Sequence, residues 1–309
     1  MNTYEKIYIS AGKFCANVVA GLMPTASMRR SVRQRLNPLN PERGVKYIAR
    51  HYVRPLSSQD TTRHPSFFAR QPIWQCWLQG ENNAPQLVRN CLASVGRNLR
   101  EDQERHIITA DNFADYVELP DYIVKKWRDG IISNTHFSDI LRIHLLQRHG
   151  GYWIDATCLL TAPIPHWMEE QETFLFHSAG EFSYTLIQNC FIYSQPDSYI
   201  IRRWCQVVDK YWEQEDKLIS YFTHHLAFRA LIAADPEFRQ HYEKMRVESE
   251  KPMHLLLAPL TSGHPYDEQL LREAAAACFV QKLTYKINAD VLADEQSLAH
   301  YFFQPSLYS

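Results

Sequence analysis

Acidic and basic side chains recur at short spacing in the segment HFSDILRIHLLQRHGGYWIDATCLLT, residues 136–161. Asp139 and Arg142 are three residues apart, so on a helix they share one face and can pair. Asp155 follows within an apolar run, where a carboxylate needs a polar partner such as a ligand, a cation or a hydrogen-bond donor. This spacing indicates a polar ligand site, and a purely structural ion pair between Asp139 and Arg142 is the alternative.

Two elements must position these charges, a buried helix and the strand that follows it. Apolar residues surround most of the helix, which predicts its burial: Phe137, Ile140, Leu141, Ile143, Leu145 and Leu146. Gly150 can adopt the left-handed backbone that ends a helix, and residues 152–160 have the pattern of a buried strand. Alternation along one continuous strand places the Asp155 and Thr157 side chains on the same side.

The same segment resembles the sugar-transferase region of capsular polysaccharide synthesis proteins and of their wider relatives in the glycosyltransferase family 32 group. There, a Ser-Asp-x-x-Arg helix leads through Gly-Gly into a strand that ends in Asp-x-Asp. Residues 138–142, 150–151 and 155–157 match this pattern, and the resemblance covers about residues 73–286. It implies an α/β fold of the GT-A nucleotide-diphospho-sugar transferase type, with a Rossmann-like mixed sheet flanked by helices.

The resemblance also implies roles for the matched residues in binding a nucleotide-diphospho-sugar donor. Asp139 matches the helix acid that contacts the sugar or the ribose, and Arg142 matches the partner that reaches the sugar or the diphosphate. Asp155 matches the first acid of Asp-x-Asp, a ligand of a divalent cation such as Mn²⁺ or Mg²⁺. Thr157 replaces the second acid, and a hydroxyl is a weaker metal ligand than a carboxylate. Asn189 is a candidate for the other face of the sugar.

Two further segments fit the same family. The apolar stretch PIWQCWLQG, residues 72–80, predicts a first strand, and Trp77 matches the aromatic residue that packs on the nucleotide base. A core tryptophan is the alternative, because large aromatic side chains dominate cores. The stretch FVQKLTYK, residues 279–286, resembles the closing strand of the family, where Lys282 and Lys286 can approach the diphosphate. Solvated lysines on a strand face are the alternative there.

Between these motifs the chain alternates helical and strand patterns, which favours a largely parallel sheet with the nucleotide at the carboxyl ends of its strands. Strand patterns also occur at residues 105–109, 173–177 and 190–194, and helical patterns at residues 85–98, 196–212, 221–233 and 236–245. Gln71-Pro72 opens this body. We therefore expect residues 66–309 to form the transferase domain and residues 1–65 to form a basic, helical N-terminal extension.

Charge is unevenly distributed along the chain. The formal net charge is −1, yet residues 1–70 contain twelve Lys or Arg and three acidic residues, a net charge of +9. Residues 4–23 have apolar side chains at helix-like spacing, and four arginines follow within residues 28–35. This pattern predicts an interfacial helix and a basic tether that bind an anionic membrane surface; a helix packed on the protein's own body is the alternative. Nucleic acid is not an expected partner, because no base-stacking module accompanies the arginines.

The overall composition is that of a globular protein. Hydrophobic residues make up 45% of the chain and charged residues 22%. The seven cysteines are scattered and form no C-x-x-C pair, which argues against a disulfide framework or a zinc site. A cytoplasmic location follows, with the N-terminal segment on the inner face of the cytoplasmic membrane.

The residues and the resemblance together predict a glycosyltransferase of capsule or other surface polysaccharide synthesis. It would transfer a hexosyl group, with retention of configuration, from a nucleotide diphosphate to a saccharide or glycolipid acceptor. Two alternatives belong to other classes. A non-catalytic nucleotide-sugar-binding protein on the same fold would bind the donor without consuming it, and a membrane-bound scaffold would bind no nucleotide.

Overall fold

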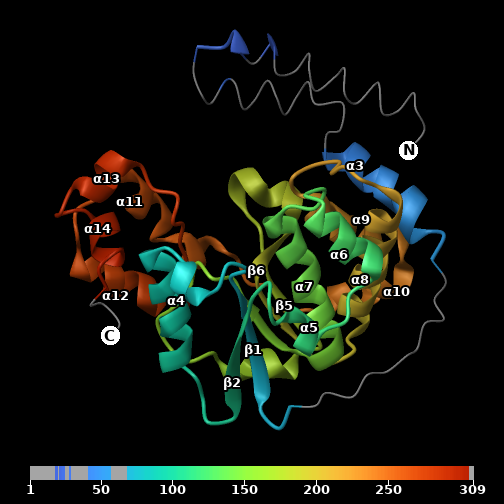
Figure 1. The fold of residues 1–309 in the computed structure, drawn as a ribbon, viewed down its shortest axis with the longest axis horizontal. Helices are drawn as coiled ribbons and strands as arrows, with labels where there is room; N and C mark the ends of the chain where they lie inside the picture. The colour runs from blue at the N-terminus through green and yellow to red at the C-terminus, as the bar shows by residue number, and fades with distance from the viewer. Residues whose placement is uncertain (1–17, 20, 25–27, 29–40, 57–67, 306–309) are drawn as a thin grey trace.

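The protein is described here by a computed structural model that covers residues 18–19, 21–24, 28, 41–56 and 68–305. Its centre is a five-stranded sheet in the order β2-β1-β3-β6-β5 (Figure 1). The strands are β1 (Gln71–Cys76), β2 (Gln103–Ile108), β3 (Gly151–Ile154), β5 (Thr173–His177) and β6 (Ile187–Ser194). β1 pairs in parallel with β2 and β3, whereas β6 runs antiparallel to both β3 and β5. This confirms the α/β class with a mixed sheet. Four of the five strands run in one direction, so the expectation of a largely parallel sheet is wrong only for β6.

Helices cover one face of this sheet. The covering helices are α5 (Phe113–Tyr116), α6 (Asp121–Arg128), α7 (Asn134–His149), α8 (Tyr199–Gln214), α9 (Thr223–Ala234) and α10 (Pro236–Glu243). α7 contacts β1, β3 and β6 directly, and α8 packs on α7. Trp74, Trp153 and Ile192 point from the sheet into this layer and belong to the main hydrophobic cluster. The largest core therefore lies between the sheet and α7.

The opposite face of the sheet is equally apolar. Strand alternation turns Ile73, Tyr152 and Phe191 away from α7, and all three are at most 1% exposed. The 3₁₀ helices η3 (His166–Glu170) and η5 (Lys251–His254) cover these three residues. Two other short 3₁₀ helices, η2 (Glu81–Asn83) and η4 (Gly180–Thr185), lie in loops. Burial on both faces explains the continuous apolar runs YWI in β3 and FLF in β5.

A capping serine begins α7, and two glycines end it. The Ser133 side chain accepts a hydrogen bond from the backbone N–H of His136 and caps the N-terminus. Gly150 follows the last turn with φ +67° and Gly151 with φ +86°, backbone conformations that glycine adopts most easily. A Cβ atom at Gly151 would lie 2.1 Å from the carbonyl oxygen of Pro72 in β1. The Gly-Gly pair therefore lets the chain turn from α7 directly into β3.

The predicted strand over residues 152–160 is divided into two, so the single continuous strand was wrong. β3 ends at Ile154, and a turn closed by a 2.8 Å hydrogen bond from the Cys158 N–H to the Asp155 carbonyl oxygen redirects the chain. β4 (Cys158–Leu160) then pairs with β7 (Val280–Lys282) in a separate two-stranded sheet. Asp155 and Thr157 thus lie in a turn rather than on one strand face.

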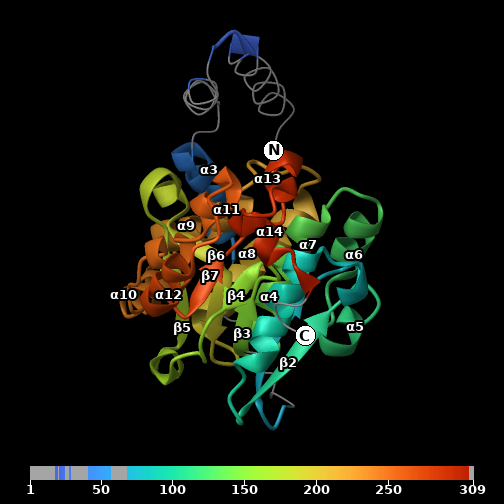
Figure 2. The ribbon, with the colours of Figure 1, turned by 90° about the vertical axis from the view of Figure 1, so that its left-hand side faces the viewer.

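The C-terminal helices gather at one end of the molecule, beside α4 (Gln86–Arg97), as Figures 1 and 2 show. They are α11 (Leu257–Ser262), α12 (Glu268–Ala277), α13 (Ala289–Ala293) and α14 (Leu298–Phe302). Leu87 of α4, Leu260 of α11 and Phe302 of α14 share one hydrophobic cluster. This packing supports the β4–β7 sheet, because Leu159 of β4 lies in the same cluster.

The chain before β1 also contributes to the main core. α3 (Pro41–Ile48) continues into a π-helix, η1 (Ala49–Val53), and both pack on α9. The Tyr52 hydroxyl donates a 2.7 Å hydrogen bond to Glu215. The predicted domain boundary after residue 65 remains a prediction, and the basic segment of residues 29–35 lies outside the described residues. None of the helices in the described ranges has both the length and the apolar character that crossing a membrane requires.

Candidate active site

A cleft of about 210 Å³ opens at the end of β1. Its walls come from the loop after β1, the first turns of α7, the turn after β3 and the segment after β7. The lining residues are Cys76, Trp77, Leu78, Gln79, Asn134, Thr135, Ser138, Arg142, Trp153, Asp155, Ala156, Thr157 and Tyr285. Four of the residues predicted from the sequence are therefore brought together here: Trp77, Arg142, Asp155 and Thr157.

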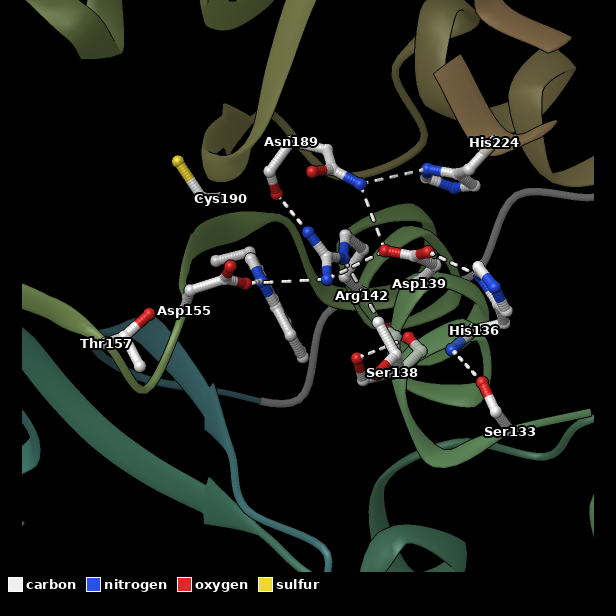
Figure 3. A network of polar contacts seen from close by, with 12 residues as sticks. Ser133, His136, Ser138, Asp139, Arg142, Asp155, Thr157, Asn189, Cys190 and His224 are labelled. Carbon is white, nitrogen blue, oxygen red and sulfur yellow. Dashed lines mark hydrogen bonds and ion pairs between the residues drawn. The ribbon is translucent and has the colours of Figure 1, made fainter. Parts of the chain in front are cut away.

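Arg142 is the centre of the polar network (Figure 3). Its Nη2 atom lies 2.9 Å from Asp139 Oδ1 and 3.4 Å from Asp155 Oδ1, so one guanidinium joins two carboxylates. Its Nη1 atom donates to the backbone carbonyl oxygen of Asn189, and the guanidinium stacks 4.9 Å above the Trp153 ring. Burial acts to lower the pKa of Arg142, but the two carboxylates outweigh it, so the charge is retained.

Asp139 is enclosed on the far side of Arg142. Its Oδ1 atom accepts a 3.0 Å hydrogen bond from Asn189 Nδ2, and its Oδ2 atom lies 3.3 Å from His136 Nδ1. Asp139 is 8% exposed and lines a separate cavity of about 20 Å³, together with His136 and His224. Burial acts to raise its pKa, but Arg142 and His136 hold the pKa below its usual range. Direct contact of Asp139 or Asn189 with a donor remains a prediction; the observed contacts orient Arg142.

Asp155 and Thr157 both accept hydrogen bonds from the side chain of Lys282. The Lys282 Nζ atom lies 2.9 Å from Asp155 Oδ2 and 2.6 Å from Thr157 Oγ1. The β4–β7 register explains this contact, because Lys282 pairs with Cys158, next to the turn. Trp153 Nε1 donates a 2.8 Å hydrogen bond to Asp155 Oδ1. Burial acts to raise the pKa of Asp155, but Lys282 and Arg142 together hold it below its usual range.

The oxygen atoms of Asp155 and Thr157 are not arranged to bind a divalent cation. Hard cations such as Mg²⁺ require several oxygen ligands, and carboxylates are the strongest. Both oxygens of Asp155 already contact cationic or N–H donors, and the hydroxyl of Thr157 faces the ammonium of Lys282. Over the described ranges, no group of three or more His, Cys, Asp or Glu side chains is arranged to hold a metal ion.

Trp77 lies at the rim of the cleft and packs against a small hydrophobic cluster that includes Val88 and Leu92. Its side chain is half-buried and packs edge-to-face on Tyr285, with 5.5 Å between the ring centroids. Its Nε1 atom is buried without a hydrogen-bond partner. Lys286 is exposed, and its Nζ atom lies over the Tyr285 ring, 6.0 Å from the ring centre. Of the two lysines expected near the diphosphate, only Lys282 contacts Asp155.

Sequence reasoning missed six polar or aromatic lining residues: Gln79, Asn134, Thr135, Ser138, Trp153 and Tyr285. Ser138 and Tyr285 fall inside the two segments that carry the family resemblance, so their position in those motifs was an available signal. Asn134 opens α7, where the first backbone N–H groups have no partner within the helix. These groups add hydrogen-bonding capacity to a cleft that otherwise presents a charged floor and an aromatic rim.

Comparison with known proteins gives this geometry a family. The sequence profile of capsular polysaccharide synthesis proteins matches residues 29–302. The O-glycosyltransferase braB of Annulohypoxylon truncatum is 25% identical over 181 residues, which are 53% of this chain and 43% of that protein. The chain therefore spans less than half the length of this curated relative.

A solved structure, that of the PaToxG glycosyltransferase, is 14% identical with a TM-score of 0.39, over 84% of this chain and 93% of its own. That similarity is too low to support an argument about the fold, which rests on the strand order and the helical layer. The profile match, in contrast, includes the helix, the Gly-Gly turn and the Asp155 turn that build the cleft. The chain belongs to the capsular polysaccharide synthesis protein family.

Proposed function

We propose that this protein is a glycosyltransferase of polysaccharide synthesis, built on a GT-A type fold. It transfers a hexosyl group, with retention of configuration, from a nucleotide diphosphate to a saccharide or glycolipid acceptor. The N-terminal segment holds it at the inner face of the cytoplasmic membrane, where a glycolipid acceptor would be anchored. Membership of the family supports this proposal.

The observation that carries the proposal is the charge arrangement at the floor of the cleft. Arg142 lines the cleft, Lys282 contacts Asp155 and Thr157 in the cleft wall, and Asp155 joins the two cations. A departing nucleoside diphosphate carries negative charge, and preorganised cations in a partly enclosed site stabilise it as it forms. Asp155, through its remaining lone pairs, and the polar side chains of α7 would orient sugar or ribose hydroxyls.

The aromatic rim gives the donor a second anchor. A nucleotide base that stacks on Trp77 would lie at the end of β1, on the Tyr285 side of the cleft. The diphosphate would then reach Arg142 and Lys282 at the floor. This direction places the sugar against the first turns of α7, where Asn134 and Ser138 line the wall.

A non-catalytic nucleotide-sugar-binding protein is the second candidate. One observation favours it: Thr157 replaces a carboxylate, and the hydroxyl is engaged by Lys282. Both candidates predict donor binding, but only a transferase consumes the donor. Hydrolysis or transfer of a bound nucleotide-sugar therefore separates them.

A thermal-shift screen tests the proposal. The purified protein is heated with uridine, guanosine, adenosine or cytidine diphosphate, each with EDTA and with Mn²⁺. A ligand that binds only the folded state raises Tm, so we expect one base to raise it above the other three. An unchanged Tm with all four nucleotides in both buffers would contradict nucleotide binding and support a structural scaffold.

A further inference from the structure

We propose that the ammonium group of Lys282 is a built-in cation at the position of the divalent ion, so that donor binding and transfer proceed without Mn²⁺ or Mg²⁺. This inference deepens the proposed function and rests on it. It explains a departure from the Asp-x-Asp pattern that the family resemblance leaves open, the hydroxyl of Thr157 in place of a second carboxylate.

The position of Lys282 is fixed by its strand. β7 pairs with β4 along Val280–Lys282, and the Leu283 N–H continues the pairing with a 2.8 Å hydrogen bond to the Thr157 carbonyl oxygen. The neighbouring Gln281 is fully buried, and its Nε2 atom donates 2.9 Å hydrogen bonds to the carbonyl oxygens of Pro252 and Ala274. Lys282 therefore extends from an anchored segment.

The ammonium group has one donor left for a ligand. Lysine has three N–H donors and no acceptor. Two of them reach Asp155 and Thr157, at 2.9 Å and 2.6 Å, and the side chain keeps 22% of its surface exposed. A phosphate oxygen in the cleft can accept a hydrogen bond from the third N–H. This contact would replace the one that the phosphate makes with a metal ion in a metal-dependent site.

Charge balance argues against a metal ion at the same place. Asp155 carries one negative charge and already contacts two positive ones, Arg142 and Lys282. A divalent ion bound to Asp155 Oδ2 and Thr157 Oγ1 would meet the ammonium within contact distance, because both ligand atoms lie within 3 Å of Nζ. Mutual repulsion of these cations would expel one of them. The hydroxyl of Thr157 accepts a hydrogen bond from the Lys282 ammonium. A second carboxylate at this position would add a negative charge and favour a divalent ion instead.

Calorimetric titration of the intact chain with the nucleoside diphosphate selected by the screen tests the inference. With 5 mM EDTA or 5 mM Mn²⁺ in the buffer, we expect Kd values that agree within about twofold. Lys282→Met should weaken binding at least tenfold in EDTA, whereas Lys282→Arg keeps a positive charge and should weaken it less. Lys244→Met is the control, since it removes an exposed lysine that does not line the cleft and should leave Kd unchanged.

A double variant should convert the lysine-containing site into a metal-binding site. In Thr157→Asp with Lys282→Met, the second carboxylate of Asp-x-Asp is restored and the ammonium is removed. This variant should bind the nucleotide at least tenfold more tightly with Mn²⁺ than with EDTA. Electron paramagnetic resonance of Mn²⁺ mixed with each protein gives a second readout, and the signal should decrease only with the double variant.

The outcomes distinguish the two proposals. If EDTA weakens wild-type binding tenfold and Mn²⁺ restores it, Lys282 yields its place to a metal ion and the inference is wrong, although the proposed function stands. The inference is also wrong if Lys282→Met binds the nucleotide as well as wild type does in EDTA. If no nucleoside diphosphate binds in either buffer, the proposed function fails, and the inference fails with it.

Discussion

At the residue scale, one guanidinium connects two acids that have different surroundings. Asp139 is held by Arg142, Asn189 and His136 and is 8% exposed, whereas the Asp155 side chain keeps 24% of its surface exposed at the cleft. A carboxylate that is enclosed by donors has little capacity left for a ligand. The contacts of Asp139 orient Arg142, and of the two acids only Asp155 lines the cleft.

Trp77→Ala should weaken nucleotide binding by about 1–3 kcal/mol, because a base that stacks on an aromatic ring gains roughly that much. The half-buried ring packs on Tyr285, so truncation should change the free energy of unfolding less than a core substitution does. Calorimetric titration and urea denaturation of the same sample measure both quantities.

Trp74→Ala is the matched control for that change. Trp74 is fully buried and donates a 3.0 Å hydrogen bond to the Gly150 carbonyl oxygen. Its truncation should lower the free energy of unfolding by about 3–5 kcal/mol. If Trp77→Ala destabilises the protein to the same extent and leaves nucleotide affinity unchanged, Trp77 is a core residue.

Acid should destabilise the protein through a buried histidine. Burial is the main cause that lowers the pKa of His225 to about 4, so the folded state keeps its imidazole neutral. The unfolded chain binds a proton near pH 6.5, and the stability contributed above that pH is lost as pH falls toward 4. This group alone should account for about 3 kcal/mol. Urea denaturation between pH 7 and pH 4 should therefore show a flatter pH dependence for His225→Gln.

The control for that experiment is His166→Gln, because the His166 side chain is 75% exposed. This variant should keep the wild-type pH dependence. An equally steep loss of stability in His225→Gln and wild type would show that other groups, such as the neighbouring His224, dominate acid unfolding.

The sequence predicted some of these contacts but not others. The spacing of Asp139 and Arg142 predicts their pairing, since residues three apart share a helix face. Asn189 is 50 positions from Asp139, and their contact depends on how β6 packs on α7. Likewise, Lys282 reaches Asp155 across 127 positions. Contacts of this kind depend on the tertiary fold, and the local periodicity of the sequence carries no information about them.

At the element scale, the Gly-Gly turn aligns the two halves of the site. It joins α7, which carries Arg142, to β3, which leads to Asp155. Gly151→Ala should lower the free energy of unfolding by more than about 3 kcal/mol, because the new methyl group would overlap the Pro72 carbonyl oxygen at a positive φ. Chemical denaturation measures this change.

Gly130→Ala separates backbone strain from the steric clash. Gly130 also has a positive φ, +74°, but a Cβ atom there meets nothing within 4 Å. The cost should be limited to about 1–2 kcal/mol for a left-handed alanine. Equal destabilisation by the two substitutions would indicate that the contact between β1 and the turn is unimportant.

Helix α7 and strand β5 follow closely from the sequence, and the ends of α7 carry a capping serine and a glycine. The predicted β1 and β6 differ at one end, since β1 ends at Cys76 and β6 begins at Ile187. The division of residues 152–160 between two sheets does not follow. YWI and CLL are equally apolar, and only the Asp155 turn and the β7 partner separate them. Strand partners far along the chain are invisible to a local pattern.

At the scale of the whole molecule, the N-terminal charge predicts a peripheral membrane contact. Each basic residue near an anionic surface contributes about 1 kcal/mol, and salt screens that attraction. Binding to phosphatidylglycerol vesicles should therefore weaken at high salt, and deletion of residues 1–36 should abolish it without loss of nucleotide binding. Co-sedimentation at two salt concentrations measures this. If full-length and truncated chains sediment equally, the segment is no membrane anchor.

We propose that sugar transfer takes place in the cleft around Asp155. The most direct measurement is release of nucleoside diphosphate from a panel of nucleotide-sugars, for wild type, Asp155→Asn and the surface control Asp129→Asn, which alters only an exposed pair with Lys125. We predict turnover of one donor by wild type and Asp129→Asn, and its loss in a folded Asp155→Asn protein. Near-normal turnover by Asp155→Asn, or no turnover of any donor that binds, would contradict this account.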